Sequence, residues 1–126
     1  MPKVLIVDDD PDVVEAVTAF LERNGFIVKS AGNRKEGFAA YTRENPDLLI
    51  LDVMMEEPDD GFALAQELRR AGCQKPIILL TSISRVTGFA YGNDPESVPV
   101  NDFLEKPVAP QVLIDKVRSL LPKTEG

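Results

Sequence analysis

The stretch VLIVDDDP, residues 4–11, joins four branched aliphatic residues directly to three acids and a proline. Four branched aliphatic residues in an unbroken run suit a strand that is covered on both faces, as in a parallel sheet. Three carboxylates follow, and adjacent carboxylates repel each other unless water or a cation compensates them. Proline then stands where the first turn of a helix accepts it. The stretch predicts a strand, a charged turn and a helix in succession.

Apolar runs and amphipathic stretches keep alternating along the rest of the chain. Strands are expected at residues 4–7, 26–30, 48–51, 77–80 and 102–105, and helices at residues 11–24, 34–44, 61–71 and from about 110 onward. Strands that alternate with helices favour a parallel sheet with right-handed crossovers. The predicted fold is therefore α/β, a flavodoxin-like doubly wound sheet of five parallel strands in the order 2-1-3-4-5.

Local signals mark the helix boundaries. Asp10 either caps the first helix or binds a ligand, and capping is the favoured interpretation because Pro11 follows it. Asn33 with Glu36 three residues later has the spacing of a capping box. Helix ends are expected at Gly25, at Asn45-Pro46 and at Gly72.

One segment departs from this regularity. Gly88, Gly92, Pro95 and Pro99 fall within residues 88–99. Glycine inside a helix costs about 1 kcal/mol and proline about 3 kcal/mol relative to alanine. The helix that this fold normally places between the last two strands is therefore predicted to be short or irregular, and residues 84–99 are predicted to lack a regular three-turn helix.

Length and composition exclude several classes of protein. The 126 residues suit one domain spanning 1–126, with a core of about 3–121, a short tail at 122–126 and no output domain. The net charge of −7, without a basic cluster, argues against nucleic-acid binding. No long apolar segment predicts a membrane span, and the single cysteine has no disulfide partner, so a cytoplasmic location is expected. The absence of histidine excludes Ser-His and Cys-His nucleophile pairs.

Acids are expected to meet at the carboxyl edge of the sheet, where such folds bind ligands. Asp8 and Asp9 end the first strand and Asp52 ends the third, while Thr81 and Lys106 end the last two. Three acids without a histidine suit a hard cation, Mg²⁺ or Mn²⁺. A lysine and a hydroxyl beside them suit a phosphoryl group. Asp52 is then the natural nucleophile, and its product would be an aspartyl phosphate.

The motifs VDDD, LILDVMM, LLTS and DFLEKP, at residues 7–10, 49–55, 79–82 and 102–107, resemble those of the receiver domain of two-component response regulators. The resemblance implies a phospho-accepting signalling switch rather than an enzyme. Asp52 would take its phosphoryl group from the phosphohistidine of a sensor histidine kinase or a phosphotransfer protein. A downstream effector protein would then be bound by surface contact.

The same resemblance implies roles for individual residues. Asp9 would bind Mg²⁺ directly, Asp8 would act mainly through a metal-bound water, and the backbone carbonyl of Met54 would be a further ligand. Thr81 would hydrogen-bond the phosphoryl oxygens, and Lys106 would pair with Asp52 or its phosphate. Phe103 would be the switch aromatic, and the Lys106-Pro107 peptide would be cis.

One loop departs from the family pattern. The stretch DVMMEEPDDG, residues 52–61, is one residue longer than usual and has Glu56 where proline is expected. Glu56 or Glu57 could therefore reach the site or a metal-bound water.

Simpler alternatives stand beside each assignment. Asp8, Asp9 and Asp52 could be solvated acids, and Lys106 could be a surface charge. Thr81 could be an ordinary strand residue, and Phe103 a core aromatic. Two other functions also compete: a receiver-like scaffold that works without phosphorylation, and an aspartate-nucleophile phosphatase. The phosphatase is disfavoured because Met54, rather than an acid, lies two residues after Asp52.

Overall fold

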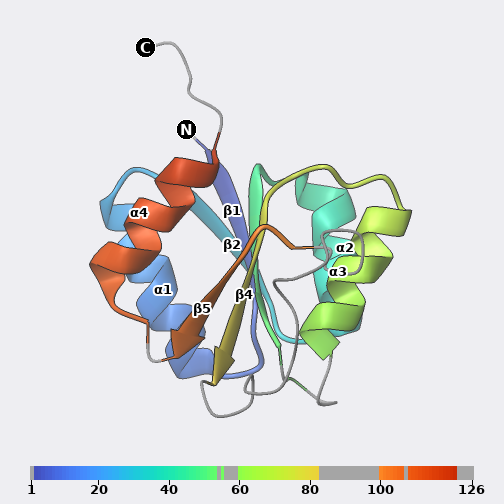
Figure 1. Cartoon of the computed structure of the whole chain (residues 1–126), viewed down its shortest axis with the longest axis horizontal. Coiled ribbons are helices and arrows are strands. Elements are labelled where there is room, and N and C mark those ends of the chain that lie inside the picture. The colour runs from blue at the N-terminus through green and yellow to red at the C-terminus, as the bar shows by residue number, and fades with distance from the viewer. Residues whose placement is uncertain (1, 54, 56–59, 83–99, 107, 122–126) are drawn as a thin grey trace.

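In the part of the chain that the structure describes, a five-stranded parallel sheet carries two helices against each face (Figure 1). The computed structural model describes residues 2–53, 55, 60–82, 100–106 and 108–121. The strands are β1 (Lys3–Val7), β2 (Ile27–Ala31), β3 (Leu48–Asp52), β4 (Ile77–Ser82) and β5 (Asp102–Lys106). The helices are α1 (Pro11–Arg23), α2 (Arg34–Glu44), α3 (Asp60–Arg70) and α4 (Pro110–Leu120). The strand order β2-β1-β3-β4-β5 confirms the predicted flavodoxin-like topology.

Two apolar cores lie on opposite faces of the sheet. The side chains of β1 alternate between them, with Val4 and Ile6 in one core and Leu5 and Val7 in the other. The first core packs under α1 and α4, and the second under α2 and α3. A strand buried on both faces needs apolar residues at every position. This is why unbroken apolar runs located the strands correctly.

Helix ends follow the predicted signals, with one difference. The Asp10 carboxylate accepts a hydrogen bond from the Asp12 amide at 2.9 Å, which makes Asp10 the N-cap of α1. Asn33 Oδ1 accepts from the Glu36 amide at 2.8 Å, but the Glu36 carboxylate accepts from Gly32 N at 3.4 Å. The second half of the capping box therefore reaches the residue before the cap. Positive φ angles end three helices, at Gly25, Asn45 and Gly72.

Strand boundaries differ from the prediction by one or two residues. β2 begins one residue late because the Phe26 amide donates to Leu21 O at 3.0 Å and so closes the turn after α1. β3, β4 and β5 each run slightly further, to Asp52, Ser82 and Lys106. The predicted site residues of these strands are thus held by sheet hydrogen bonds rather than by loops.

Several predictions fall outside the described residues. They are the irregular helix at 84–99, the Met54 carbonyl, the altered loop with Glu56 and Glu57, the cis peptide at Pro107 and the tail at 122–126. Of the described helices, none has the length and apolar character that crossing a membrane requires.

Candidate functional site

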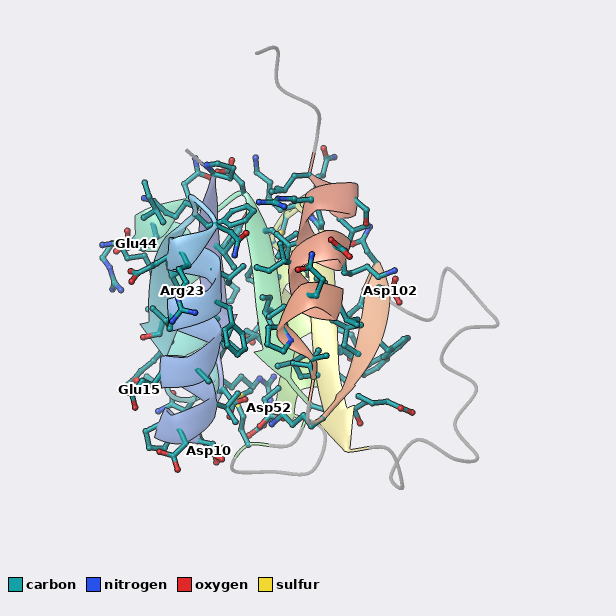
Figure 2. All side chains as sticks on the ribbon, turned by 90° about the vertical axis from the view of Figure 1, so that its left-hand side faces the viewer. Asp10, Glu15, Arg23, Glu44, Asp52 and Asp102 are labelled. Atoms are coloured by element: carbon teal, nitrogen blue, oxygen red, sulfur yellow. The ribbon has the colours of Figure 1, made fainter. Side chains whose placement is uncertain are left out.

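Three acids lie together at the carboxyl ends of β1 and β3. One carboxylate oxygen from each of Asp8, Asp9 and Asp52 lies within 4.8 Å of the others. Asp8 and Asp9 follow β1 directly, and Asp52 is the last residue of the neighbouring strand β3. Figure 2 shows Asp52 and Asp10 at the same end of the molecule, with Glu44 toward the opposite end. The strand order therefore brings these acids together, as the sequence predicts.

The three acids differ in how far they are exposed to solvent. Asp8 is 2% exposed and Asp52 is 5% exposed, whereas Asp9 is exposed to solvent. The alternative of solvated acids is thus wrong for Asp8 and Asp52. Two buried carboxylates so close together are costly unless an opposite charge or hydrogen-bond donors compensate them.

Lys106 supplies that opposite charge. Its Nζ lies 3.0 Å from Asp52 Oδ1 and 3.2 Å from Asp8 Oδ2. Asp8 also accepts a hydrogen bond from the Asp10 amide at 2.9 Å. The alternative that Lys106 is an ordinary surface charge is therefore wrong, because its ammonium bridges two buried carboxylates.

The surroundings of Asp52 raise its pKa above the ordinary value of an aspartate. Burial raises the pKa of Asp52 from 3.8 to about 6, the negative charge of Asp8 adds to this effect, and the hydrogen bond from Lys106 opposes it. Burial lowers the pKa of Lys106, but the hydrogen bond that Lys106 donates to Asp52 and the negative charges of Asp52 and Asp8 outweigh this effect and raise the pKa. A cation beside Asp52 would favour its ionised form.

This shift predicts how the metal-free protein responds to pH. Between the ordinary value of 3.8 and about 6, the folded protein holds a proton on Asp52 that the unfolded chain has released. The stability that this proton contributes is lost as the pH rises through about 6, so Asp52→Asn should stabilise the metal-free protein at pH 7 by about 1–2 kcal/mol. Urea unfolding in a chelator, at pH 5 and pH 7, measures this. The difference in the free energy of unfolding between Asp52→Asn and the wild type should be larger at pH 7 than at pH 5. A smaller difference at pH 7 would contradict a raised pKa for Asp52.

The backbone behind Asp52 is fixed by the start of α3. The Val53 amide donates to Leu80 O at 2.9 Å, and the Gly61 amide donates to Val53 O at 2.9 Å. Gly61 lies so close that a Cβ there would come 2.0 Å from the Asp52 carbonyl oxygen. No role for Gly61 follows from the sequence pattern alone, although the Asp-Gly pair at residues 60–61 ends a motif of the family.

An ion pair between helices braces the same region. Asp60, buried at 5% exposure, lies 3.9 Å from the Arg34 guanidinium, which also contacts Glu67 at 3.3 Å. Arg34 begins α2, whereas Asp60 and Glu67 belong to α3. This ion pair could not be predicted from the sequence, because no local pattern shows which helices lie side by side.

Thr81 and Phe103 lie on the face of the sheet that packs against α2 and α3. Phe103 pairs in register with Leu79, and both belong to the core region under α2 and α3. Thr81 is 3% exposed and follows Leu79 by two residues, so it shares that face. Phe103 packs partly buried against this core, as the core-aromatic alternative expected. Packing of this kind is also compatible with a switch role.

Known proteins agree with this arrangement. A family model described as the response regulator receiver domain matches residues 4–118. The DNA-binding dual master transcriptional regulator RpaA of Synechocystis is 34% identical over 127 residues, which cover 99% of this chain and 51% of that protein. Response regulator MprA of Mycobacterium leprae is 36% identical over 123 residues, which cover 98% of this chain and 52% of that protein. The chain spans about half the length of these curated relatives.

Solved structures match over nearly the whole chain. Response regulator protein TrrA from Thermotoga maritima, solved in complex with Mg²⁺-BeF, aligns with a TM-score of 0.80 and 30% identity over 96% of this chain and 100% of that one. The receiver domain of the Francisella response regulator 1452 aligns with a TM-score of 0.80 and 30% identity over 95% and 96% of the two chains. With its strand order and its acidic cluster, this chain belongs to the response regulator receiver domain family.

Proposed function

We propose that the chain is a phospho-accepting switch of a two-component phosphorelay, in which Asp52 receives the phosphoryl group. The observation that carries this proposal is the meeting of Asp8, Asp9 and Asp52 within 4.8 Å, with the Lys106 ammonium 3.0 Å from Asp52. The donor would be the phosphohistidine of a sensor histidine kinase or a phosphotransfer protein. A receiver domain is a signalling module rather than a true enzyme.

The chemistry is a single displacement at phosphorus. A carboxylate oxygen of Asp52 forms the new bond as the bond from phosphorus to the donor imidazole breaks, and the imidazole nitrogen takes a proton as it leaves. Such transfer depends mostly on positioning and on compensation of charge. Lys106 would keep its charge close to the phosphoryl oxygens, and Thr81 would donate a hydrogen bond to them.

The donor set fits a divalent cation. Three carboxylates against one ammonium leave two excess negative charges, and every candidate ligand atom is an oxygen. Mg²⁺, or Mn²⁺, prefers such oxygen ligands. We propose Asp9 and Asp52 as direct ligands, Asp8 as a ligand through water and the Met54 carbonyl as a further ligand. When bound, the cation supplies positive charge to the phosphoryl oxygens.

The output would be a change of surface near β5. Thr81 and Phe103 share one face of the sheet, two strand positions apart, so a movement of Thr81 toward a phosphoryl group would alter the packing around Phe103. We propose that a downstream effector protein reads this change by contact, in the cytoplasm. The net charge of −7 supports a protein partner rather than nucleic acid. We also propose that residues 1–126 form one receiver domain.

Incubation with acetyl phosphate and Mg²⁺ tests the proposal. Intact mass spectrometry should show the gain of one phosphoryl group in the wild-type protein. A protein that stays unlabelled under these conditions would support the alternative of a scaffold that works without phosphorylation. Continuous turnover of many phosphomonoesters would instead support the phosphatase.

The division of roles among the acids predicts different effects on metal binding. Asp9→Ala should weaken Mg²⁺ binding about tenfold or more, because it removes a proposed direct ligand. Asp10→Ala should leave Mg²⁺ affinity within about twofold to threefold, although losing the helix cap costs about 1 kcal/mol of stability. Calorimetric titration of both variants with Mg²⁺ measures this. Equal losses of affinity would count against Asp9 as the direct ligand.

A further inference from the structure

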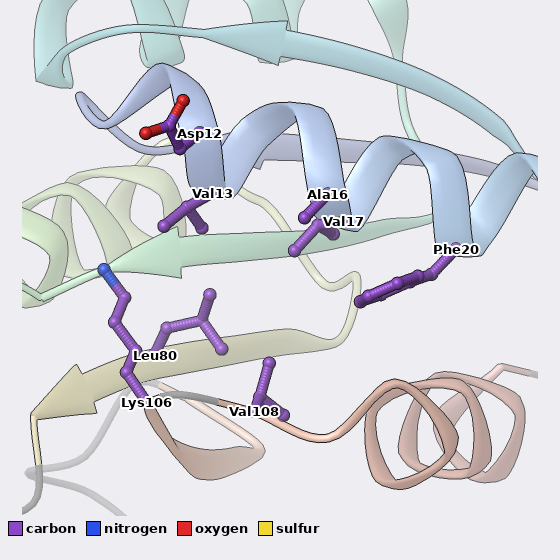
Figure 3. Close-up of a pocket in the computed structure, with 8 residues that line it drawn as sticks. All are labelled: Asp12, Val13, Ala16, Val17, Phe20, Leu80, Lys106 and Val108. Atoms are coloured by element: carbon purple, nitrogen blue, oxygen red, sulfur yellow. The ribbon is translucent and has the colours of Figure 1, made fainter.

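An apolar cavity opens between α1 and the end of β5, outside the cluster of acids (Figure 3). Its volume is about 460 Å³, within the range of about 300–1,000 Å³ that small-molecule sites occupy. Its lining includes two core residues, Leu80 and Val17, which are 0% and 2% exposed. The cavity is therefore an open groove whose floor includes residues of the core under α1 and α4.

One face of α1 forms a whole wall of the cavity. Val13, Ala16, Val17 and Phe20 recur at intervals of three and four residues and so lie along one side of the helix. Val108, just before α4, lies opposite them in Figure 3. Covering such walls with an apolar ligand removes apolar surface from water, which is favourable. The small side chain of Ala16 leaves the space open at the middle of the wall.

Charge is confined to one end of the cavity. Figure 3 shows Asp12 and the ammonium of Lys106 near the same end, with Phe20 at the other. Because the Lys106 ammonium is paired with Asp8 and Asp52, it offers the cavity mainly its apolar stem. Asp12 is exposed, and the neighbouring Asp9 and Asp10 add negative charge beside it. A cationic group at this end would be attracted, and an anionic one repelled.

We propose that this cavity binds a small apolar molecule that carries one cationic group. The apolar body would lie between Phe20 and Val108, and the cation would face Asp12. The site does not depend on phosphorylation, but its occupant would touch the stem of the same lysine that pairs with Asp52. The ligand would thus contact a side chain of the proposed phosphorylation site without entering the cluster of acids.

A matched pair of probes tests both parts of the proposal. Naphthylethylamine and naphthylacetate share the same ring system but carry opposite charges. Titrations of the ¹⁵N-labelled protein followed by NMR should move the amide signals of Val13, Phe20 and Val108. We expect the amine to bind about fivefold more tightly than the acid. The Asp12→Asn variant should bring the two affinities together.

Filling the cavity supplies the second test. Ala16→Leu should weaken amine binding about tenfold, because the larger side chain takes up the space along the wall. Ala39→Leu is the matched control, since Ala39 is also an exposed helical alanine, on α2, and does not line the cavity. Both changes keep a good helix former, and thermal melting checks that both variants fold.

Several results would overturn the proposal. They are no binding of either probe up to its solubility limit, equal binding of amine and acid to the wild-type protein, and unchanged amine binding in Ala16→Leu. Sedimentation adds one more outcome. A self-association of the wild type that Ala16→Leu abolishes would mean that a second copy of the chain, rather than a small molecule, covers the cavity.

Discussion

Asp52→Asn should abolish labelling by acetyl phosphate and Mg²⁺, whereas the wild-type protein should gain one phosphoryl group. An amide has neither the negative charge nor the nucleophilic oxygen that attack on phosphorus requires. Asparagine has nearly the same size as aspartate, so the packing at the end of β3 and the contact with Lys106 should change little. Intact mass spectrometry measures the label directly, and digestion of the labelled wild type locates it.

The control for this experiment is the same change at an acid outside the cluster. Asp115 is exposed on α4, where its carboxylate accepts a hydrogen bond from Gln111, so Asp115→Asn should be labelled like the wild type. A stoichiometric label on Asp52→Asn would show that another residue accepts the phosphoryl group. Loss of label in both variants would point to a general effect on the protein rather than to the nucleophile.

Much of the site could be predicted once the strand order was known. Asp8 follows Ile6 by two residues, Asp52 follows Ile50 by two, and Lys106 follows Leu104 by two. Ile6, Ile50 and Leu104 all belong to the core region under α1 and α4. Because side chains alternate along a strand, the three site residues share that face of the sheet. Their meeting is a consequence of apolar alternation and parallel topology, both of which the sequence contains.

The solvent exposure of each acid could not be predicted in the same way. Asp8 and Asp9 are chemically identical neighbours in the sequence, yet Asp8 is buried and Asp9 is exposed. The difference arises because the Asp8 amide continues the sheet by donating to Ala31 O at 3.1 Å, which turns its side chain toward Lys106. Contacts of this kind join residues far apart in the chain, and no local pattern records them.

The sequence pattern also does not show that α3 lies very close to β3. This close approach leaves room only for glycine at residue 61. The sequence predicted a helix starting at Gly61, and glycine at a helix start has many ordinary explanations. The structure gives a steric one, because the first turn of α3 packs directly on the backbone that carries Asp52. The helix α3 therefore holds the backbone of Asp52, the proposed nucleophile, in place at the edge of the sheet.

Glycine substitutions should consequently differ widely in cost, with Gly61→Ala the most damaging. A Cβ at residue 61 would lie 2.0 Å from Asp52 O, 2.7 Å from Asp52 C and 2.8 Å from the Val53 Cα. All three are backbone atoms, so no side-chain rotation can relieve the overlap. We expect a loss of about 3 kcal/mol or more in the free energy of unfolding, because β3 or α3 must shift.

Urea unfolding measures this loss, and alanine substitutions at two other glycines serve as comparisons. A Cβ at Gly32 would meet only the Glu36 carboxylate, at 3.7 Å, so Gly32→Ala should stay within about 0.5 kcal/mol of the wild type. A Cβ at Gly37 would meet side-chain atoms of Val7 and Leu64 at 2.9–3.0 Å, and the better helix propensity of alanine offsets about 1 kcal/mol of that crowding. Gly37→Ala should therefore fall between the other two. If Gly61→Ala unfolds at the same urea concentration as Gly32→Ala, the packing of α3 on the Asp52 backbone is not as tight as the structure indicates, and α3 cannot be what holds Asp52 in position.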